Sequence, residues 1–128
     1  MKRLFLFLFI AATIVSCKVT FVPTKSQTAL DMVHQIQQDA NNAFYTAMYD
    51  YDAYSKVSNE IDSLIAFDKS RAKSSIILKQ DDRIKRMFDT ISSEHKAKSE
   101  IVATEQDAYK SYFKSVIDAR LIAENSLK

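Results

Sequence analysis

Apolar residues recur at intervals of three and four along residues 26–67, which is the spacing of one face of a helix. One set repeats every seven positions, a second lies three positions further on, and Asp50 is the only polar member. The sets are Val33, Ala40, Ala47, Tyr54 and Ile61, then Ile36, Ala43, Val57 and Leu64. A heptad sustained over more than four repeats is typical of a coiled-coil seam. The pattern predicts one long helix over about 26–67.

Residues 68–75 are polar and interrupt this pattern. We expect a turn there, with Ser74 or Ser75 capping the next helix. Apolar positions then return on one broad face from 76 to 123, which predicts a second helix over about 76–126. Its weak stretch is 92–100, where Glu94 and Lys98 fall on the otherwise apolar face. A break near 92–95, giving an elongated three-helix bundle, is the competing arrangement.

Folding the two predicted helices back at residues 71–72 places their apolar positions opposite one another. The same register places Asp50 opposite Glu94 and His95, with Lys98 one turn away. We therefore predict an all-α fold, a long antiparallel, coiled-coil-like helical hairpin. These four residues would form one polar layer that sets its register at some cost in stability.

A lone two-helix hairpin buries only one stripe per helix, which is usually marginal for stability. We therefore expect a further contact, with a second copy of the chain or with a helical partner protein. Tyr45 and Tyr49 lie one turn apart on the back of the first predicted helix, with Phe67 roughly aligned. An exposed aromatic strip of this kind is a candidate partner contact.

The composition argues against catalysis. The 128-residue chain has no glycine and a single proline, Pro23, so it lacks the phosphate-binding loop, the dinucleotide fingerprint and the nucleophile elbow. Its two histidines, His34 and His95, would lie far apart in the hairpin and have no further ligand at metal-binding spacing. We therefore expect no catalytic residue, no metal, no cofactor and no small-molecule substrate.

The first 17 residues form a separate segment. Lys2 and Arg3 precede an apolar run of 12 residues, and Ile14-Val15-Ser16-Cys17 closes it. A basic start, a short apolar stretch and a small residue at the cut site describe a secretory signal. The run is too short to span a bilayer, which needs about 20 residues. Cys17 is the chain's only cysteine and directly follows the expected cut site, so residues 14–17 resemble the lipobox of bacterial lipoproteins.

The resemblance implies cleavage between Ser16 and Cys17, leaving diacylglyceryl and usually a further acyl chain (such as palmitate) on Cys17. Two or more acyl chains anchor a protein stably. The chain would then comprise a signal peptide (1–16), an acylated cysteine with a tether (17–25) and a helical domain (26–128). In enterobacterial lipoproteins, an Asp directly after the acylated cysteine retains the protein in the inner membrane. This chain has Lys18 at that position, so the expected location in a two-membrane host is the outer membrane, facing the periplasm. Loss of Lys2 and Arg3 leaves 16 basic and 16 acidic residues, so we expect no nucleic-acid binding.

These features together predict a protein of the bacterial cell envelope that is not an enzyme. The leading hypothesis is a lipid-anchored helical spacer, scaffold or accessory subunit that works through protein–protein contacts. One alternative is a lipoprotein that binds the cell wall or a ligand through Tyr45 and Tyr49. A second alternative is an envelope-bridging lipoprotein, similar in role to the outer-membrane spanin subunits of phages.

Overall fold

The computed structural model describes residues 24–71 and 74–128, which form four α-helices and contain no strand. The helices are α1 (Gln27–Phe44), α2 (Tyr51–Ser70), α3 (Ser75–Ala97) and α4 (Ala103–Asn125). The predicted cleavage and acylation residues, Ser16 and Cys17, and most of the tether lie outside the described residues. None of the helices in these described ranges has the length and apolarity that crossing a membrane requires.

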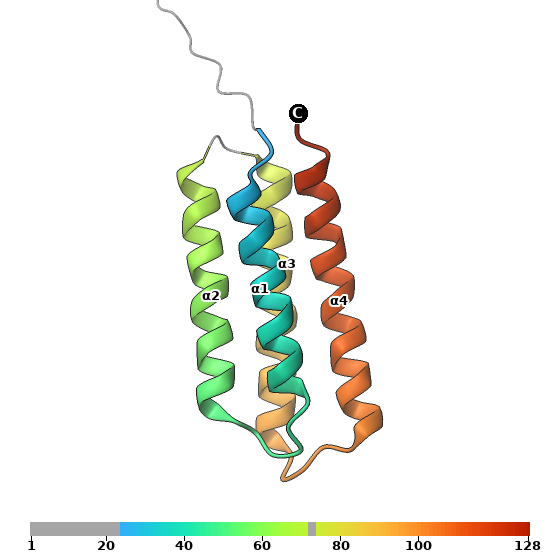
Figure 1. Cartoon of the computed structure of the whole chain (residues 1–128). Coiled ribbons are helices and arrows are strands. Elements are labelled where there is room, and N and C mark those ends of the chain that lie inside the picture. The colour runs from blue at the N-terminus through green and yellow to red at the C-terminus, as the bar shows by residue number, and fades with distance from the viewer. Residues whose placement is uncertain (1–23, 72–73) are drawn as a thin grey trace, which may run out of the picture.

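The four helices run alternately up and down in one bundle (Figure 1). Helices α1 and α3 each pack against both α2 and α4, whereas the backbones of the diagonal pairs do not adjoin. The 23-residue helices α3 and α4 are each about 35 Å long. The start of α1, the α2–α3 connection and the end of α4 share one end, which we call the entry end. The other two connections, residues 45–50 and 98–102, form the loop end.

The hairpin of two long helices predicted from the sequence is wrong, because each predicted helix is interrupted near its middle. The first ends at Phe44 and a new helix begins at Tyr51. The second ends at Ala97 and resumes at Ala103, so the three-helix alternative with a break near 92–95 is also wrong. Helix α2 ends at Ser70 and α3 begins at Ser75, within the stretch 68–75 where the sequence predicts a turn; residues 72–73 lie outside the described residues. Ser74 caps α3 by accepting a hydrogen bond from the Ile77 N–H.

Asp50 explains the first interruption. The residue that breaks the apolar seam is the N-cap of α2, and its Oδ1 accepts hydrogen bonds from the Asp52 and Ala53 N–H groups, both at 3.1 Å. Capping satisfies backbone donors that a helix start leaves free. At the second interruption, the Glu105 carboxylate accepts from the Val102 N–H at 3.0 Å and pairs with Lys98. Both chain reversals thus have side chains that stabilise a new helix start.

Reversal also gives each amphipathic helix two neighbours in place of one, which buries more of its apolar face. The predicted seam residues of the first half are indeed buried, except at the reversal itself. Buried members are Val33, Ile36, Ala40, Ala43, Tyr54, Val57, Ile61 and Leu64. The antiparallel pairing of the two halves survives, because α2 packs on α3 and α1 packs on α4.

Phe44 stands at the centre of the core, where it contacts an aromatic ring from each of the other helices. Its ring centroid lies 6.0 Å from that of Tyr54 on α2, 6.2 Å from Phe88 on α3 and 5.6 Å from Phe113 on α4. Aromatic pairs at these separations add to the energy of simple burial. One residue, at the last position of α1, therefore ties all four helices together near the loop end.

Candidate functional site

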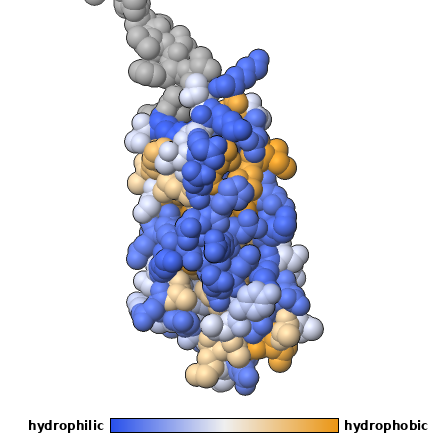
Figure 2. All heavy atoms as spheres, in the orientation of Figure 1, coloured by the Kyte–Doolittle hydropathy of each residue, from blue (hydrophilic) through white to orange (hydrophobic). Residues whose placement is uncertain are grey.

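The loop end carries most of the large apolar side chains that the described residues expose. Tyr45, Met48, Tyr51 and Val102 lie in or beside the two loops, and their exposed fractions run from 60% at Val102 to 71% at Met48. Figure 2 shows apolar residues at this end, below a middle region that is mostly hydrophilic. A clustered apolar patch at one end of a small protein is a candidate contact surface.

Tyr45, one of the three residues predicted to contact a partner, belongs to this patch. It occupies the C-cap position of α1, and the residue remains 62% exposed. The Lys110 ammonium of α4 lies 3.2 Å from the centroid of that ring, a cation–π contact. Lys110 therefore holds the Tyr45 ring against α4 while leaving most of its surface free.

The other two predicted contact residues are not part of an exposed strip. Tyr49 is half-buried: its ring stacks on Tyr54 with centroids 4.5 Å apart, and its hydroxyl lies 2.9 Å from Ser92 Oγ. Phe67 is half-buried at the opposite end of the bundle, where the Arg71 guanidinium lies 5.7 Å from its ring centroid. The interruption of the first predicted helix separates these residues, which a continuous helix would have aligned.

The four residues predicted to form a polar layer lie at the loop end, and only His95 among them is buried. Asp50 caps α2, Lys98 pairs with Glu105, and Glu94 is exposed. The predicted hairpin places these residues opposite one another, and their position has a simpler cause than a polar layer inside a long hairpin. Both polar stretches belong to chain reversals, and the two reversals lie at the same end of the bundle.

His95 on α3 holds the 45–50 loop at this end of the bundle. Its Nε2 lies 3.2 Å from the Ala47 carbonyl oxygen, and its Nδ1 lies 2.7 Å from the Tyr54 hydroxyl. Because a carbonyl only accepts, Nε2 carries the proton, and Nδ1 accepts from Tyr54 in the neutral ring. The Ala47 carbonyl also accepts from the Ile101 N–H at 2.9 Å. Burial raises the pKa of Tyr54, which keeps its hydroxyl a donor.

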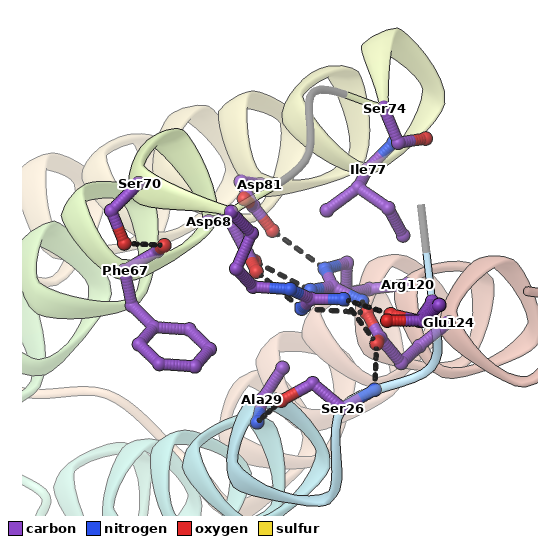
Figure 3. Close-up of polar contacts among 12 residues, drawn as sticks. Ser26, Ala29, Phe67, Asp68, Ser70, Ser74, Ile77, Asp81, Arg120 and Glu124 are labelled. Atoms are coloured by element: carbon purple, nitrogen blue, oxygen red, sulfur yellow. Dashed lines mark hydrogen bonds and ion pairs between the residues drawn. The ribbon is translucent and has the colours of Figure 1, made fainter. Parts of the chain in front are cut away.

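A second cluster, which we call the ion network, lies inside the entry end (Figure 3). Arg120 on α4 donates from Nη2 to Asp68 on α2 at 2.5 Å, from Nε to Asp81 on α3 at 2.6 Å, and from Nη1 to Glu124 at 2.8 Å. All four side chains are buried. One guanidinium therefore connects three helices through charge-assisted hydrogen bonds, which are stronger than neutral ones.

Arg71, the residue that ends α2, completes the ion network. Its guanidinium pairs with Asp68 at 2.6 Å and with Glu124 at 2.7 Å, and it donates to the Thr24 carbonyl at 2.8 Å. The backbone N–H of Ser26, the N-cap of α1, donates to Glu124 at 2.6 Å. The ion network thus also holds the start of α1, so residues from all four helices or their caps take part.

The ion network contains three carboxyl groups and two guanidinium groups, which affects its protonation. Burial raises the pKa of Asp81 to about 7; Arg120 opposes this rise, and the neighbouring Asp68 carboxyl adds to it. The Oδ2 atom of Asp81 is buried with no donor within reach in the described residues. Burial also acts to raise the pKa of Glu124, but the hydrogen bonds from Arg71, Ser26 and Arg120 outweigh it and lower that pKa.

The ion network is not among the sites predicted from the sequence, although the sequence contains a signal for it. Asp68, Asp81 and Arg120 each fall at the spacing of buried apolar neighbours: Leu64, Ile77 and Ile117 precede them by three or four residues. Charged residues at core positions in three helices, all near one end of the bundle, indicate an internal ion network.

Comparison of the chain with protein-family models, with curated proteins and with solved structures finds no match. In residues 24–71 and 74–128, no three His, Cys, Asp or Glu residues are grouped in a way that could hold a metal ion. The three carboxylates and Arg120 of the ion network are buried and its charges engage one another, so its arrangement suits a structural role. The exposed loop end is the surface on which a functional proposal can be based.

Proposed function

We propose that the chain is a lipid-anchored protein of a bacterial envelope that acts without catalysis, as an accessory subunit binding a partner protein through its loop end. The observation that carries this proposal is the position of the apolar patch. The segment that leads to Cys17 joins the bundle at residue 24, at the entry end. The patch lies at the opposite end and comprises Tyr45, Met48, Tyr51 and Val102. Anchoring at Cys17 would direct this patch away from the membrane.

The dimensions suit such a role. An extended segment of eight residues, such as 18–25, spans at most about 26–29 Å. The bundle adds about 35 Å, in place of the roughly 63 Å expected of a continuous helix over 26–67. The loop end would therefore meet a partner within several tens of ångströms of the leaflet.

The loop end is also preorganised for binding. Hydrogen bonds from Ile101 and His95 to the Ala47 carbonyl join the two loops, and Lys110 holds the Tyr45 ring. A surface that is already ordered loses less conformational entropy on binding. Tyr and Met are enriched at protein interfaces, so the composition of the patch also favours a protein partner.

A partner protein suits the fold better than a second copy of the chain. Self-association was expected because a two-helix hairpin leaves its apolar stripes poorly covered. Four helices of one chain bury these stripes together, with Phe44 at the centre. The core is complete within one chain, so a second copy is not required for stability. The cell-wall alternative relied on Tyr45 and Tyr49, but Tyr49 packs against the core.

Site-specific photocrosslinking in membranes tests the proposal. A photoreactive amino acid at Met48 should give one discrete adduct with a partner protein, whereas the same amino acid at Ser115, exposed in the middle of α4, should not. The double substitution Tyr51→Ser and Val102→Ser should weaken the Met48 adduct. Equal adducts from both positions, or an adduct only between two copies of the chain, would contradict the proposal.

The anchor is tested separately by fractionation. The wild-type chain should sediment with membranes and incorporate labelled palmitate, and Cys17→Ser should abolish the label and release the chain. Retention of the label by Cys17→Ser would place the acyl group elsewhere, and the anchoring proposal would then fail.

A further inference from the structure

The outermost turns of the entry end have an uneven charge distribution, because their acidic side chains lie inside and their lysines lie outside. The described residues of these outermost turns are 24–30, 67–71, 74–79 and 122–128. The acidic side chains among them are Asp68 and Glu124, and both are buried in the ion network. The exposed charged side chains there are all lysines: Lys25, Lys69, Lys79 and Lys128.

The ion network is the cause of this separation. Arg120 and Arg71 pair with Asp68 and Glu124 inside the bundle, so these carboxylates are engaged where the surface lysines cannot reach them. Within the described part of the chain, none of the four entry-end lysines takes part in an ion pair, whereas lysines farther along the bundle, such as Lys56, Lys85 and Lys114, do. The outermost turns of this end therefore expose lysines that form no ion pair, and the nearest exposed carboxylates, Asp31 and Asp82, lie just beyond these turns.

Two exposed apolar side chains accompany the lysines. Ile76 in the first turn of α3 is 61% exposed, and Ile122 in the last turn of α4 is 70% exposed. These neighbouring helices place both isoleucines at the entry end. Lysines together with a few exposed aliphatic side chains are the composition of surfaces that bind anionic membranes.

We propose that the entry end docks on an anionic lipid surface, with Lys25, Lys69 and Lys79 over the headgroups and Ile76 and Ile122 at the acyl boundary. This inference rests on the proposed anchoring at Cys17, because the segment that leads to that residue joins the bundle at this same end. Docking orients the bundle, so the loop end points away from the leaflet. The acyl anchor attaches the chain to the membrane, and the lysines orient the bundle relative to it.

Vesicle sedimentation with the mature chain lacking acyl groups (residues 18–128) tests docking without the anchor, since this chain contains the whole bundle. It should bind vesicles of phosphatidylcholine with 30% phosphatidylglycerol at low salt, and bind little to pure phosphatidylcholine. Raising the salt to ~0.5 M should release it, because salt screens exposed charges. Equal binding to both vesicle types, or no binding to either, would overturn the proposal.

A matched pair of substitutions on α3 locates the surface. Lys79 and Lys96 are both exposed and outside the ion pairs described, and they lie at opposite ends of the same helix. Lys79→Gln should weaken partitioning about fivefold, and Lys69→Gln with Lys79→Gln about 25-fold, at low salt. Lys96→Gln should have no effect. Equal losses from Lys79→Gln and Lys96→Gln would indicate general charge attraction and contradict docking by one end.

Chemical modification of the wild-type chain provides a second measurement that needs no variant. Vesicles with phosphatidylglycerol should slow acetylation of Lys25, Lys69 and Lys79, and leave that of Lys56 and Lys96 unchanged. Uniform protection, or protection confined to Lys96, would overturn the proposed orientation. Failure here leaves the photocrosslinking and acylation tests of the proposed function unaffected, so the two proposals can fail independently.

Discussion

Arg120 on α4 donates a hydrogen bond to Asp68 on α2 across the diagonal of the bundle, at 2.5 Å and fully buried. The backbones of these two helices do not adjoin, so the two side chains meet across the interior of the entry end. The contact explains how a short four-helix bundle can close one end with charged residues. It also determines which charges remain on the outside of that end.

Replacing Arg120 should destabilise the bundle strongly. Arg120→Met leaves three buried carboxyl groups with one guanidinium, and breaking a buried ion pair by removing one partner costs about 3–5 kcal/mol. Arg120→Lys should recover little, because an ammonium cannot reproduce the guanidinium fork that reaches three carboxyl groups. Urea unfolding followed by circular dichroism measures the change. Arg83→Met, at an exposed position on α3, serves as the control and should stay within about 0.5 kcal/mol of wild type.

Stability should depend on pH through Asp81. Its pKa is raised from 3.8 to about 7 in the folded chain. The folded state therefore holds a proton that the unfolded state has lost, and stability decreases as pH rises from about 4 to 7. The groups around Asp81 are Asp68 from α2 and Arg120 from α4, with Glu124 and Arg71 in the same ion network. Glu124 acts in the opposite direction, because its lowered pKa removes stability only as the solution becomes more acidic.

The substitution Asp81→Asn tests this assignment, since the amide resembles the protonated carboxyl. Its melting temperature should change less than that of wild type between pH 5 and pH 8, and should exceed that of wild type at pH 8. Asp82→Asn, at the exposed neighbouring position, should retain the wild-type profile. Parallel pH profiles for Asp81→Asn and wild type would show that another group dominates.

The hydrogen bond from Tyr54 to His95 should contribute more than the one between Tyr49 and Ser92. Tyr54→Phe leaves a buried imidazole nitrogen unpaired, which costs about 1–3 kcal/mol. Tyr49→Phe also removes a hydroxyl, but Tyr49 is half-buried and water can take the place of its hydroxyl. This substitution should therefore reduce the free energy of unfolding less than Tyr54→Phe. Hydrogen exchange of the Ile101 amide provides a second measurement, because this N–H bonds to the same Ala47 carbonyl as His95. Equal losses in both variants would contradict the proposed link between the loops.

Removing the cap at Asp50 should weaken α2. Asp50→Ala loses the two hydrogen bonds that Oδ1 accepts from Asp52 and Ala53, at a cost of about 1 kcal/mol. Asp89→Ala, at an exposed position within α3, provides a matched loss of one carboxylate. Were Asp50 part of a continuous helix, substitution by alanine would instead stabilise the chain, because alanine is the better helix former.

The size of residues 18–128 in solution distinguishes the bundle from a long hairpin. A compact domain of about 100 residues has a radius of gyration near 13 Å. Small-angle scattering should give a value close to this, whereas a hairpin built from a continuous 42-residue helix ~63 Å long should give a clearly larger radius of gyration. Light scattering should give the mass of one chain, because the core is complete without a partner. An elongated dimer would contradict the bundle.

Much of the fold follows from periodicity alone. Spacings of three, four and seven identify helices and the residues on their apolar faces, and these residues are buried because each helix must cover that face. The boundary between α2 and α3, the Ser74 cap and the antiparallel pairing of the two halves are also predictable. Ile76, Val102 and Tyr112 fit the same pattern yet are exposed, because each lies at a helix end or on an outer face.

Sequence by itself determined that this protein is helical and which faces are apolar, because helical spacing and side-chain polarity are local properties of the chain. Only the tertiary structure decided that both predicted helices reverse, at 45–50 and 98–102, since an amphipathic pattern continues unchanged across a short loop and no glycine or proline marks these positions. It also decided that Asp68, Asp81 and Arg120 meet inside. Charges on separate helices are compensated only once packing brings those helices together.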